Sequence, residues 1–237
     1  MKQGAIPSGL ERALAVSAHP DDAEFFAGAT LAALARGGAA VALVVCTDGA
    51  KGGHEVRDLA KTRRHEQAAA AEILGVSEVV YLTLPDGELS AGEPLRELLV
   101  AAIRRLRPQL VLAHDPRTWF QPAGALTALG HSDHRAAGAA TLDAVYPRAA
   151  SRAFYAAQLR DPVLEVWNPR DLWLFDTAQP DFAIDVSETF ETKLAALRAH
   201  ASQERGPGGL VEPARAAAQR AGAPDHPAET FVRLRLW

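Results

Sequence analysis

The sequence predicts an α/β protein with a doubly wound, mostly parallel sheet that helices flank. Over the first 150 residues, short apolar segments of strand length alternate four times with longer segments of helical spacing, which is typical of parallel sheets with right-handed crossovers. Residues 41–46 form a continuous apolar run, as expected of a parallel strand buried on both faces. We therefore expect a Rossmann-like sheet, with a smaller C-terminal α+β portion after residue 150.

Each predicted strand of the first part is followed by a predicted helix. The strands are residues 14–18, 41–46, 79–82 and 110–113, and the helices are residues 21–36, 56–74, 95–106 and 131–145. Apolar residues recur at helical spacing in the first helix, and Gly37 and Gly38 follow it as a C-terminal signal. Gly75 ends the second helix, and Pro108 stops the third.

Two longer segments separate these elements. Residues 47–53 are rich in glycine but lack the residue order of a phosphate-binding loop, so we expect a mobile loop over a pocket. Residues 115–130 contain Trp119 and Phe120, which would either line the substrate pocket or anchor this loop in the core.

After residue 150 the elements become shorter. We expect strands at residues 172–175, 182–184 and 230–237, a helix over residues 188–202, a Gly/Pro-rich stretch at residues 206–209 and an alanine-rich helix after it. We therefore divide the chain into residues 1–150, which form the core, and residues 151–237, which complete the same domain.

The composition excludes several classes of function. The 25 Lys and Arg residues against 29 Asp and Glu residues give a net charge of −4, without the basic stripe of nucleic-acid-binding proteins or a polybasic membrane anchor. No apolar run approaches the ~18 residues of a membrane helix, and the first residues lack the apolar region of a signal peptide. We expect a cytoplasmic protein that binds neither nucleic acid nor membrane.

A histidine and several acids gather where the first predicted strand ends, in the sequence Ala-His-Pro-Asp-Asp-Ala-Glu of residues 18–24. Sheets of this class bind ligands at the carboxyl ends of their strands. His19 and Asp22 are three positions apart and can face one point, with Asp21 beside them. The alternative is that Asp21 or Asp22 only caps the following helix, which explains one acid but not the whole cluster.

A second cluster, Gly-His-Ser-Asp-His-Arg, occupies residues 130–135. His131 and His134 are three positions apart in the first turn of a predicted helix, so both can project to one side; alternatively, they are polar residues that face solvent. His19, Asp22 and one further histidine would complete the three-ligand set of a catalytic zinc site. Because Cys46 is the single cysteine, a metal site within the chain needs histidines and carboxylates.

The remaining histidines carry weaker signals. His114 and Asp86 lie, like His19, at or just past the end of a predicted strand. Taken one at a time, however, the histidines outside the two clusters are more often structural or exposed than metal ligands. These are His54, His65, His114, His200 and His226.

The two clusters together resemble the LmbE-like/PIG-L family of zinc-dependent N-deacetylases. The resemblance extends to an Arg-x-x-Glu helix at Arg63 and Glu66, a Pro-Asp-Gly turn at residues 85–87, and a Lys…His-x-Ser-Gln segment at residues 193–203. Ser132 departs from the family, in which proline is more usual between the histidine and the aspartate. This departure leaves the residues of the metal motif in place.

The resemblance implies a metal and a base. His19, Asp22 and His134 would bind Zn²⁺, although another divalent metal such as Fe²⁺ would suit the same ligands. The metal would lower the pKa of a bound water toward ~7 and polarise the amide carbonyl. Asp21, which is next to a ligand but is not one, would accept the proton of the water as general base.

The resemblance also implies the other catalytic and substrate contacts. His131 would stabilise the oxyanion and donate a proton to the leaving amine, with Asp133 keeping its imidazole oriented and charged. Arg63 and Asp86 would contact the substrate; the alternatives are a charge on a helix surface for Arg63 and a turn residue for Asp86.

These roles describe a hydrolase that removes the N-acetyl group from an N-acetylglucosaminyl substrate and yields acetate and a free amine. Residues 1–150 would be the metal-binding catalytic core, and residues 151–237 would shape the pocket for this small amino sugar. Self-association into a homo-oligomer stays open. A first alternative is an amidase of the same family that cuts a larger acyl group from a glucosaminyl conjugate.

Two further alternatives are not enzymes. In a nucleotide-binding Rossmann domain, a Gly-rich turn would be needed where Asp21 and Asp22 stand, and these acids would repel a pyrophosphate. A metal-binding protein that has lost its activity is disfavoured, because Asp21 and His131 accompany all three expected ligands.

Overall fold

The structure of the protein is a computed structural model that describes residues 2–52, 57–123, 126–203, 209–222 and 225–236. The strands of the main sheet are β1 (Lys2–Gly4), β2 (Arg12–Ser17), β3 (Ala40–Thr47), β4 (Glu78–Leu84), β5 (Leu110–His114), β8 (Asp171–Phe175), β9 (Phe182–Asp185) and β10 (Ala228–Arg235). The helices are α1 (Asp22–Arg36), α2 (Leu59–Leu74), α3 (Leu95–Leu106), α4 (Ser132–Asp143), α5 (Phe190–Arg198) and α6 (Val211–Ala221). Strands β6 (Phe120–Ala123) and β7 (Leu126–Leu129) form a separate hairpin.

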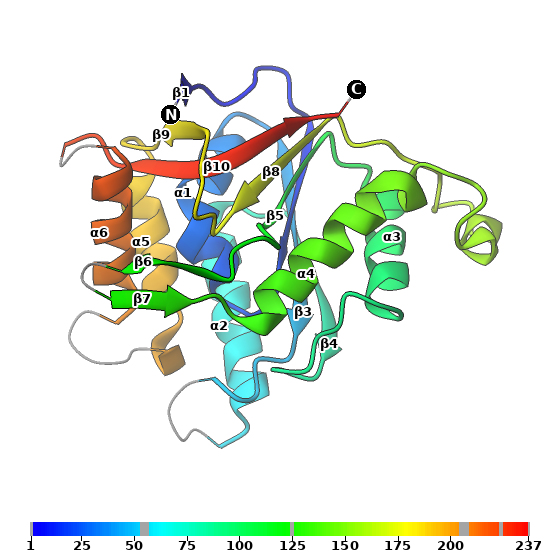
Figure 1. The fold of residues 1–237 in the computed structure, drawn as a ribbon, viewed down its shortest axis with the longest axis horizontal. Helices are drawn as coiled ribbons and strands as arrows, with labels where there is room; N and C mark the ends of the chain where they lie inside the picture. The colour runs from blue at the N-terminus through cyan, green and yellow to red at the C-terminus, as the bar shows by residue number, and fades with distance from the viewer. Residues whose placement is uncertain (1, 53–56, 124–125, 204–208, 223–224, 237) are drawn as a thin grey trace.

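The main sheet has the strand order β1-β9-β10-β8-β5-β2-β3-β4 (Figure 1). Five neighbouring strands, from β8 to β4, pair in parallel. Strand β10 is antiparallel to both of its neighbours, β8 and β9, and β1 pairs in parallel with β9. This mostly parallel sheet confirms the predicted fold class, and the segment after residue 150 adds β8, β9 and β10 to the same sheet.

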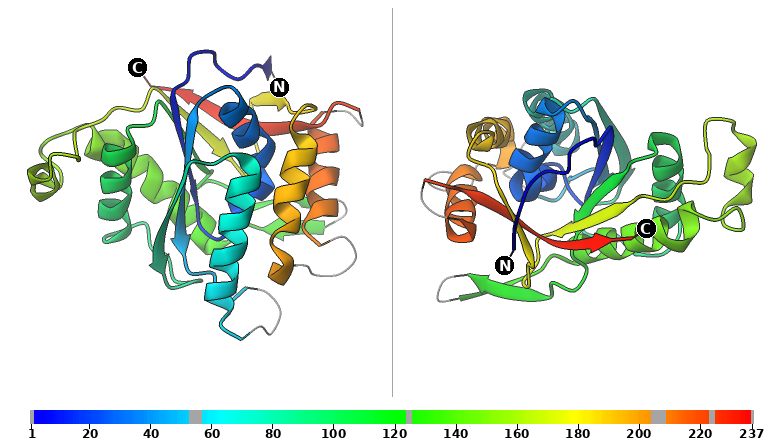
Figure 2. Two further views of the ribbon diagram at one scale, coloured as in Figure 1. Left: turned by 180° about the vertical axis from the view of Figure 1, so that it is seen from behind. Right: turned by 90° about the horizontal axis from the view of Figure 1, so that it is seen from above.

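Helices cover both faces of the sheet. Figure 2 shows α1, α2, α5 and α6 side by side on one face, whereas α3 and α4 lie on the other. The central strands are buried on both faces because their residues alternate: Ala15 faces the α1 side, and Leu14 and Val16 face the α4 side. The continuous apolar runs in the sequence therefore correspond to the buried parallel strands.

Several elements differ from the sequence prediction. The β6–β7 hairpin lies within residues 115–130, which were expected to be a loop, and no element was predicted where the three-residue strand β1 lies. The helix predicted over residues 131–145 ends at Asp143, and the segment Ala144–Ala149 that follows is kinked at Tyr146, whose backbone is extended, with φ of −144° and ψ of 130°. The helix predicted over residues 188–202 is α5 followed by a 3₁₀ turn, Ala201–Gln203.

Some predicted features fall partly outside the described residues. They are the start of the helix over residues 56–74, His54 and the last residue of the 47–53 loop, residues 206–208 of the Gly/Pro-rich stretch, and the last residue of the final strand. Among the described residues, no helix combines the length and the apolar character that a bilayer crossing requires.

The fold brings α4 unusually close to the end of β5. A Cβ atom at Gly138 would overlap the carbonyl oxygen of His114, the last residue of β5. Because only glycine leaves room there, α4 packs directly against the carboxyl end of β5 at its second turn. Strands β2, β4 and β8 run parallel to β5, so the segments that follow them begin at the same edge.

Candidate active site

A cavity of about 600 Å³ opens at this edge of the sheet. Its described lining residues are His19, Asp21, Lys51, Gly52, Arg63, Asp86, Gly87, His131, His134, Gln203, Gly209 and Leu210. Most of the residues singled out in the sequence therefore share one cavity. The two exceptions, Asp22 and Asp133, are buried, with 5% and 0% of their surface exposed, and contact His19.

His19 and Asp22 meet as their spacing predicted. The main-chain N–H of His19 donates to Oδ2 of Asp22 at 2.7 Å, and Nδ1 of the His19 ring lies 3.4 Å from the same oxygen. Asp21 occupies the N-cap position of α1 but makes no capping hydrogen bond with its side chain. Helix capping therefore explains neither the position nor the contacts of these two acids.

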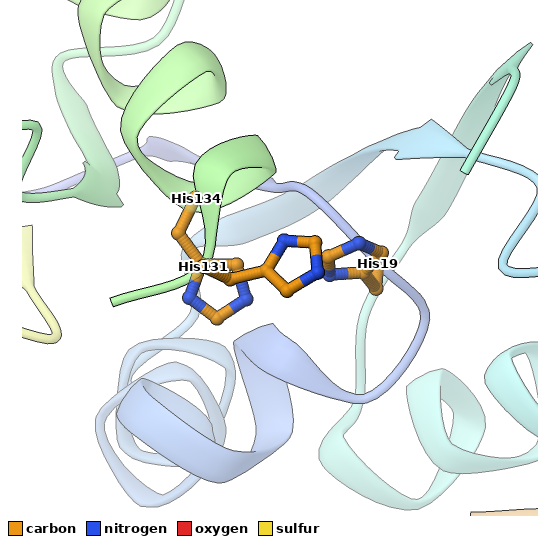
Figure 3. A group of neighbouring side chains, drawn as sticks. All are labelled: His19, His131 and His134. Atoms are coloured by element: carbon orange, nitrogen blue, oxygen red, sulfur yellow. The ribbon is translucent and has the colours of Figure 1, made fainter. Parts of the chain in front are cut away.

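The two histidines of α4 approach His19 from the other side of the cavity. Figure 3 shows the three rings gathered between the first turn of α4 and the loop that leads into α1. The centroid of the His19 ring is 4.7 Å from that of His131 and 5.3 Å from that of His134. Nε2 of His134 also lies 3.2 Å from Oδ1 of Asp22. The predicted ligands His19, Asp22 and His134 are thus joined through Asp22.

Among the described residues, three overlapping groups of side chains have donor atoms within 4.8 Å of one another, close enough to hold a metal ion. They are His19, His131 and His134; Asp22, His114 and His134; and His19, Asp86 and Asp133. Imidazole nitrogens and carboxylate oxygens are the donors of thiolate-free zinc sites, and they also suit Fe²⁺. The donor set therefore fits a divalent metal without selecting one.

The electrostatics of the site favour positive charge. Burial alone would lower the pKa of His19, but hydrogen bonds with Asp133, Asp22 and Asp86 outweigh burial and raise its pKa to about 12. Burial likewise opposes protonation of His134, but Asp22 and Asp176 outweigh burial and raise the pKa of His134 to about 9. The negative potential that favours a proton on these rings also favours a divalent cation between them.

Asp21 is held in an uncommon conformation. Its backbone is left-handed, with φ of 98°, which is infrequent for a residue with a side chain. Its main-chain N–H donates to Oε1 of Gln67 at 3.1 Å, and Nη2 of Arg63 donates to its carboxylate at 3.1 Å. Burial and the neighbouring charge of Asp22 raise the pKa of Asp21 to about 6, against the opposing effect of Arg63. The carboxylate of Asp21 is thus ionised near neutral pH, and it is a stronger base than an ordinary aspartate.

Arg63 lies inside the protein and not on a helix surface, since only 3% of its side chain is exposed. Besides Asp21, its guanidinium donates to the carbonyl oxygens of Gly49 at 3.0 Å and of Pro20 at 2.5 Å. Arg63 therefore ties the Gly-rich loop to the loop that carries the expected base, while it still lines the cavity. A substrate contact by Arg63 stays a prediction.

Asp86 is more than a turn residue. Its Oδ1 lies 3.1 Å from Nε2 of His19, and its Oδ2 accepts from the main-chain N–H of Lys51 at 2.8 Å. The hydrogen bond from His19 is the main reason that the pKa of Asp86 is lowered to about 2. The Gly-rich loop thus borders the cavity, with Lys51 bonded to the Pro-Asp-Gly turn.

Asp133 differs from the expectation that it orients His131. Its carboxylate accepts from the main-chain N–H groups of Gly87 at 2.7 Å and Leu89 at 3.2 Å, and it lies 3.3 Å from Nε2 of His19. Only its main-chain N–H contacts His131, donating to Nδ1 at 3.1 Å. The first turn of α4 directs this side chain at the turn after β4, so Asp133 fixes that turn and His19 instead.

Two buried residues of the site were missed in the sequence. His114, read as a structural or exposed histidine, is fully buried, with its ring centroid 4.1 Å from that of His134 and its Nε2 3.2 Å from Oδ2 of Asp22. Asp176 follows β8, and its Oδ2 lies 2.9 Å from Nδ1 of His134. Both residues stand at the carboxyl end of a strand, which was the available signal.

The structure also shows where the remaining aromatic and histidine residues of the sequence analysis lie. Trp119 and Phe120 are each 63% exposed, so they are not core anchors, and they are not among the described residues that line the cavity. His65 and His226 are exposed, as expected, whereas His200 is buried beneath the site, with its Nε2 3.7 Å from Oε2 of Glu24.

Comparisons with known proteins agree with this geometry. Residues 14–145 match the model of the family described as PIG-L, GlcNAc-PI de-N-acetylase. Diacetylchitobiose deacetylase of Thermococcus kodakarensis is 33% identical over 204 residues, which cover 82% of this chain and 70% of that protein. A 1D-myo-inositol 2-acetamido-2-deoxy-alpha-D-glucopyranoside deacetylase of Mycobacterium sp. (strain KMS) is 31% identical over 239 residues, covering 82% of this chain and 74% of that protein.

Among solved structures, the N,N'-diacetylchitobiose deacetylase of Pyrococcus horikoshii, complexed with an inhibitor, is similar over almost the whole chain. The TM-score is 0.83 at 28% sequence identity, and the match covers 96% of this chain and 85% of that chain. The similarity therefore includes the part of the chain after residue 150, beyond the family match.

Proposed function

Because the chain belongs to the PIG-L (LmbE-like) family of de-N-acetylases, we propose that it is a metal-dependent hydrolase acting on an N-acetylglucosaminyl compound. It removes the acetyl group as acetate and leaves a free amine. The observation that carries the proposal is the meeting of His19, Asp22 and His134, with Asp21 and His131 in the same cavity. The names of its relatives support the substrate class, since both are deacetylases of N-acetylated amino sugars.

We propose Zn²⁺ as the metal, held by His19, Asp22 and His134. When bound, the ion supplies a Lewis acid that lowers the pKa of water toward about 7 and polarises the amide carbonyl. Fe²⁺ remains the alternative, because the same imidazole and carboxylate donors suit it.

Asp21 acts as the general base in this proposal. The oxygen of water forms a bond to the carbonyl carbon of the acetyl group, and the proton of that water goes to the Asp21 carboxylate. A base with a pKa of about 6 is well matched to proton transfer near neutral pH. The bond from Arg63 and the left-handed backbone fix where this carboxylate lies.

His131 donates the proton that the leaving amine needs when the carbon–nitrogen bond breaks. Its Nδ1 accepts from the main-chain N–H of Asp133, so the neutral ring carries its proton on Nε2. We assign that Nε2–H first to a hydrogen bond with the oxyanion. As the carbon–nitrogen bond breaks, this proton passes to the amine nitrogen, and the proton that Asp21 took from the water replaces it on His131, so that both side chains regain their starting protonation. The carboxylate of Asp133 contributes indirectly, through His19 and the turn after β4.

Arg63 and Asp86 are our candidates for contacts with the sugar, because both line the cavity beside Lys51. Residues 151–237 contribute Gln203 and Leu210 to the same lining, in line with a role of this portion in shaping the pocket. A cytoplasmic location and assembly into a homo-oligomer are further parts of the proposal. The names of the relatives, which are deacetylases, favour neither the amidase nor the nucleotide-binding alternative.

The proposal is tested by elemental analysis of the purified protein, coupled to an assay of amine and acetate release. The panel contains N-acetylglucosamine, N,N'-diacetylchitobiose, an N-acetylglucosaminyl inositol, and a glucosamine conjugate with a bulkier acyl group. We expect one metal per chain and release of acetate in equal amount to free amine. Preference for the bulky conjugate would support the amidase, and stabilisation by NAD with no effect of Zn²⁺ would overturn the metal assignment.

A further inference from the structure

Asp176 lies at the carboxyl edge of the sheet, directly after β8, and has no role in the mechanism above. Its backbone is left-handed, with φ of 53°, a region that aspartate tolerates better than most residues. This turn directs the side chain back over the edge toward α4, where only 6% of it is exposed. A buried carboxylate needs partners.

Each carboxylate oxygen of Asp176 has such a partner. Oδ2 lies 2.9 Å from Nδ1 of His134 and 3.6 Å from Nδ1 of His114. Oδ1 accepts from the side-chain amide of Gln121 at 3.1 Å. The carboxylate therefore joins the expected ligand His134 to strand β6 of the hairpin.

The chemistry of this contact fixes the ring of His134. Ring nitrogens of His134 and His114 lie beside the carboxylate of Asp176, and an ionised carboxylate only accepts hydrogen bonds. Nδ1 of His134 must then donate to it, which leaves Nε2 as the metal-binding nitrogen. That Nε2 lies 3.2 Å from Oδ1 of Asp22, another expected ligand.

We propose that Asp176 is a positioning residue for the metal site: it orients His134 so that Nε2 meets the ion, and Gln121 holds Asp176 in turn. A carboxylate on the far nitrogen of a ligating histidine sets the tautomer and raises the basicity of the ligand. The inference rests on the proposed metal-binding role of His134, and it adds two residues from outside both sequence clusters.

The hairpin is attached to α4 at a second place, which supports this arrangement. The guanidinium of Arg135, the residue after His134, lies over the ring of Trp119 at 4.0 Å and donates to the carbonyl oxygen of Gly130 at 2.6 Å. The base of the hairpin is thus bound to the turn that carries His134, so Gln121 is anchored relative to that ligand.

The test is the affinity of the full-length protein for Zn²⁺, measured by competition with a chromogenic chelator at fixed pH. In Asp176→Asn the side chain keeps its shape and tolerates the left-handed backbone but loses the charge. We expect this variant to bind Zn²⁺ about 10- to 100-fold more weakly than the wild type. Gln121→Ala should show a smaller loss, because it removes a support of Asp176 and no contact with His134.

Asp115→Asn is the matched control. Asp115 lies at the same edge, directly after His114, and 2% of its side chain is exposed against 6% for Asp176. Among the described residues, its carboxylate contacts Arg117 and Thr177 and no histidine. We expect its Zn²⁺ affinity to match that of the wild type. The visible spectrum after Co²⁺ substitution gives a second readout, and it should change in Asp176→Asn but not in Asp115→Asn.

The outcomes separate this inference from the proposed function. If Asp176→Asn binds Zn²⁺ as tightly as the wild type, or if Asp115→Asn loses as much affinity, the positioning role is wrong, whatever the protein deacetylates. Wild-type affinity in Gln121→Ala would remove Gln121 from the inference. A large loss in Asp176→Asn would support the positioning role even if no sugar on the panel releases acetate.

Discussion

The guanidinium of Arg63 bonds the carboxylate of Asp21 at 3.1 Å and, from the same side chain, the carbonyl oxygens of Gly49 and Pro20. One buried cation thus fixes both the expected base and the two loops on either side of it. A Cβ atom at Gly49 would lie 2.8 Å from Nη1 of Arg63, so the Gly-rich loop needs glycine to pass this close. The position of the base depends on a residue that is 42 positions away in the chain.

Asp21→Asn should abolish turnover while the protein keeps its metal. The amide cannot accept the proton of the water, and general-base catalysis contributes about 10²- to 10⁴-fold, so we expect a loss of kcat in that range. Elemental analysis should give the same metal content as in the wild type, because Asp21 is not an expected ligand. Full activity of this variant would refute the role of Asp21 as base.

His134→Ala should lose the metal. This substitution removes one of the three expected ligands, together with the ring that lies 3.2 Å from Asp22 and 2.9 Å from Asp176. We expect metal content near zero after dialysis and no release of acetate. His65→Ala is the control, because His65 is exposed on α2; it should keep both metal and activity. Retention of stoichiometric metal in His134→Ala would place the ion elsewhere.

The ion pair between Lys193 and Glu229 should matter for stability far more than a surface pair. The two side chains are 3% and 2% exposed and 2.6 Å apart, and Glu229 also accepts from the main-chain N–H groups of Ala29 and Thr30 in α1. Lys193→Met leaves a buried carboxylate without its cation, which we expect to lower the free energy of unfolding by about 3–5 kcal/mol.

The free energy of unfolding is measured by urea titration, and the control for this stability prediction is Arg36→Met. Arg36 pairs with Glu188, and their side chains are 58% and 88% exposed, so the loss should be about 0–1 kcal/mol. Equal losses in the two variants would mean that burial of the Lys193–Glu229 pair does not govern its contribution.

His200 should make stability depend on pH in the neutral range. Burial opposes its protonation, but the nearby carboxylates, Glu24 above all, outweigh burial and raise the pKa of His200 above its usual 6.5. A raised pKa in the folded state stabilises the fold fully below pH 6.5, and this contribution disappears as the pH rises through the folded-state pKa. The melting temperature of His200→Gln should therefore differ more from that of the wild type at pH 6 than at pH 9. A difference that grows toward pH 9 would contradict the raised pKa.

The parts of the site that are local in sequence could be predicted from it. The spacing of His19 and Asp22, and that of His131 and His134, places each pair on one turn of chain, and the structure brings these pairs together. The strands were predictable for a related reason: burial on both faces leaves a continuous apolar run, as in residues 41–46.

The remaining contacts depend on which strands become neighbours. Asp176 reaches His134 only because β8 pairs with β5 and α4 packs on the end of β5, and neither relationship is written in the residues around Asp176. The carboxylate of Asp133 finds Gly87 and Leu89 for a similar reason. The β6–β7 hairpin was missed because its apolar residues Phe120 and Leu129 are 63% and 83% exposed and so do not mark a side that faces the core.

Gly138 lies one helical turn after His134, on the same side of α4, and its missing side chain lets the helix touch the carbonyl of His114. A methyl group at this position would push the start of α4 outward. His131 and His134 would then move away from His19 and Asp22, which follow β2. A substitution of Gly138, natural or engineered, would therefore change the distances between the expected ligands, although Gly138 itself is not part of the proposed metal or sugar site.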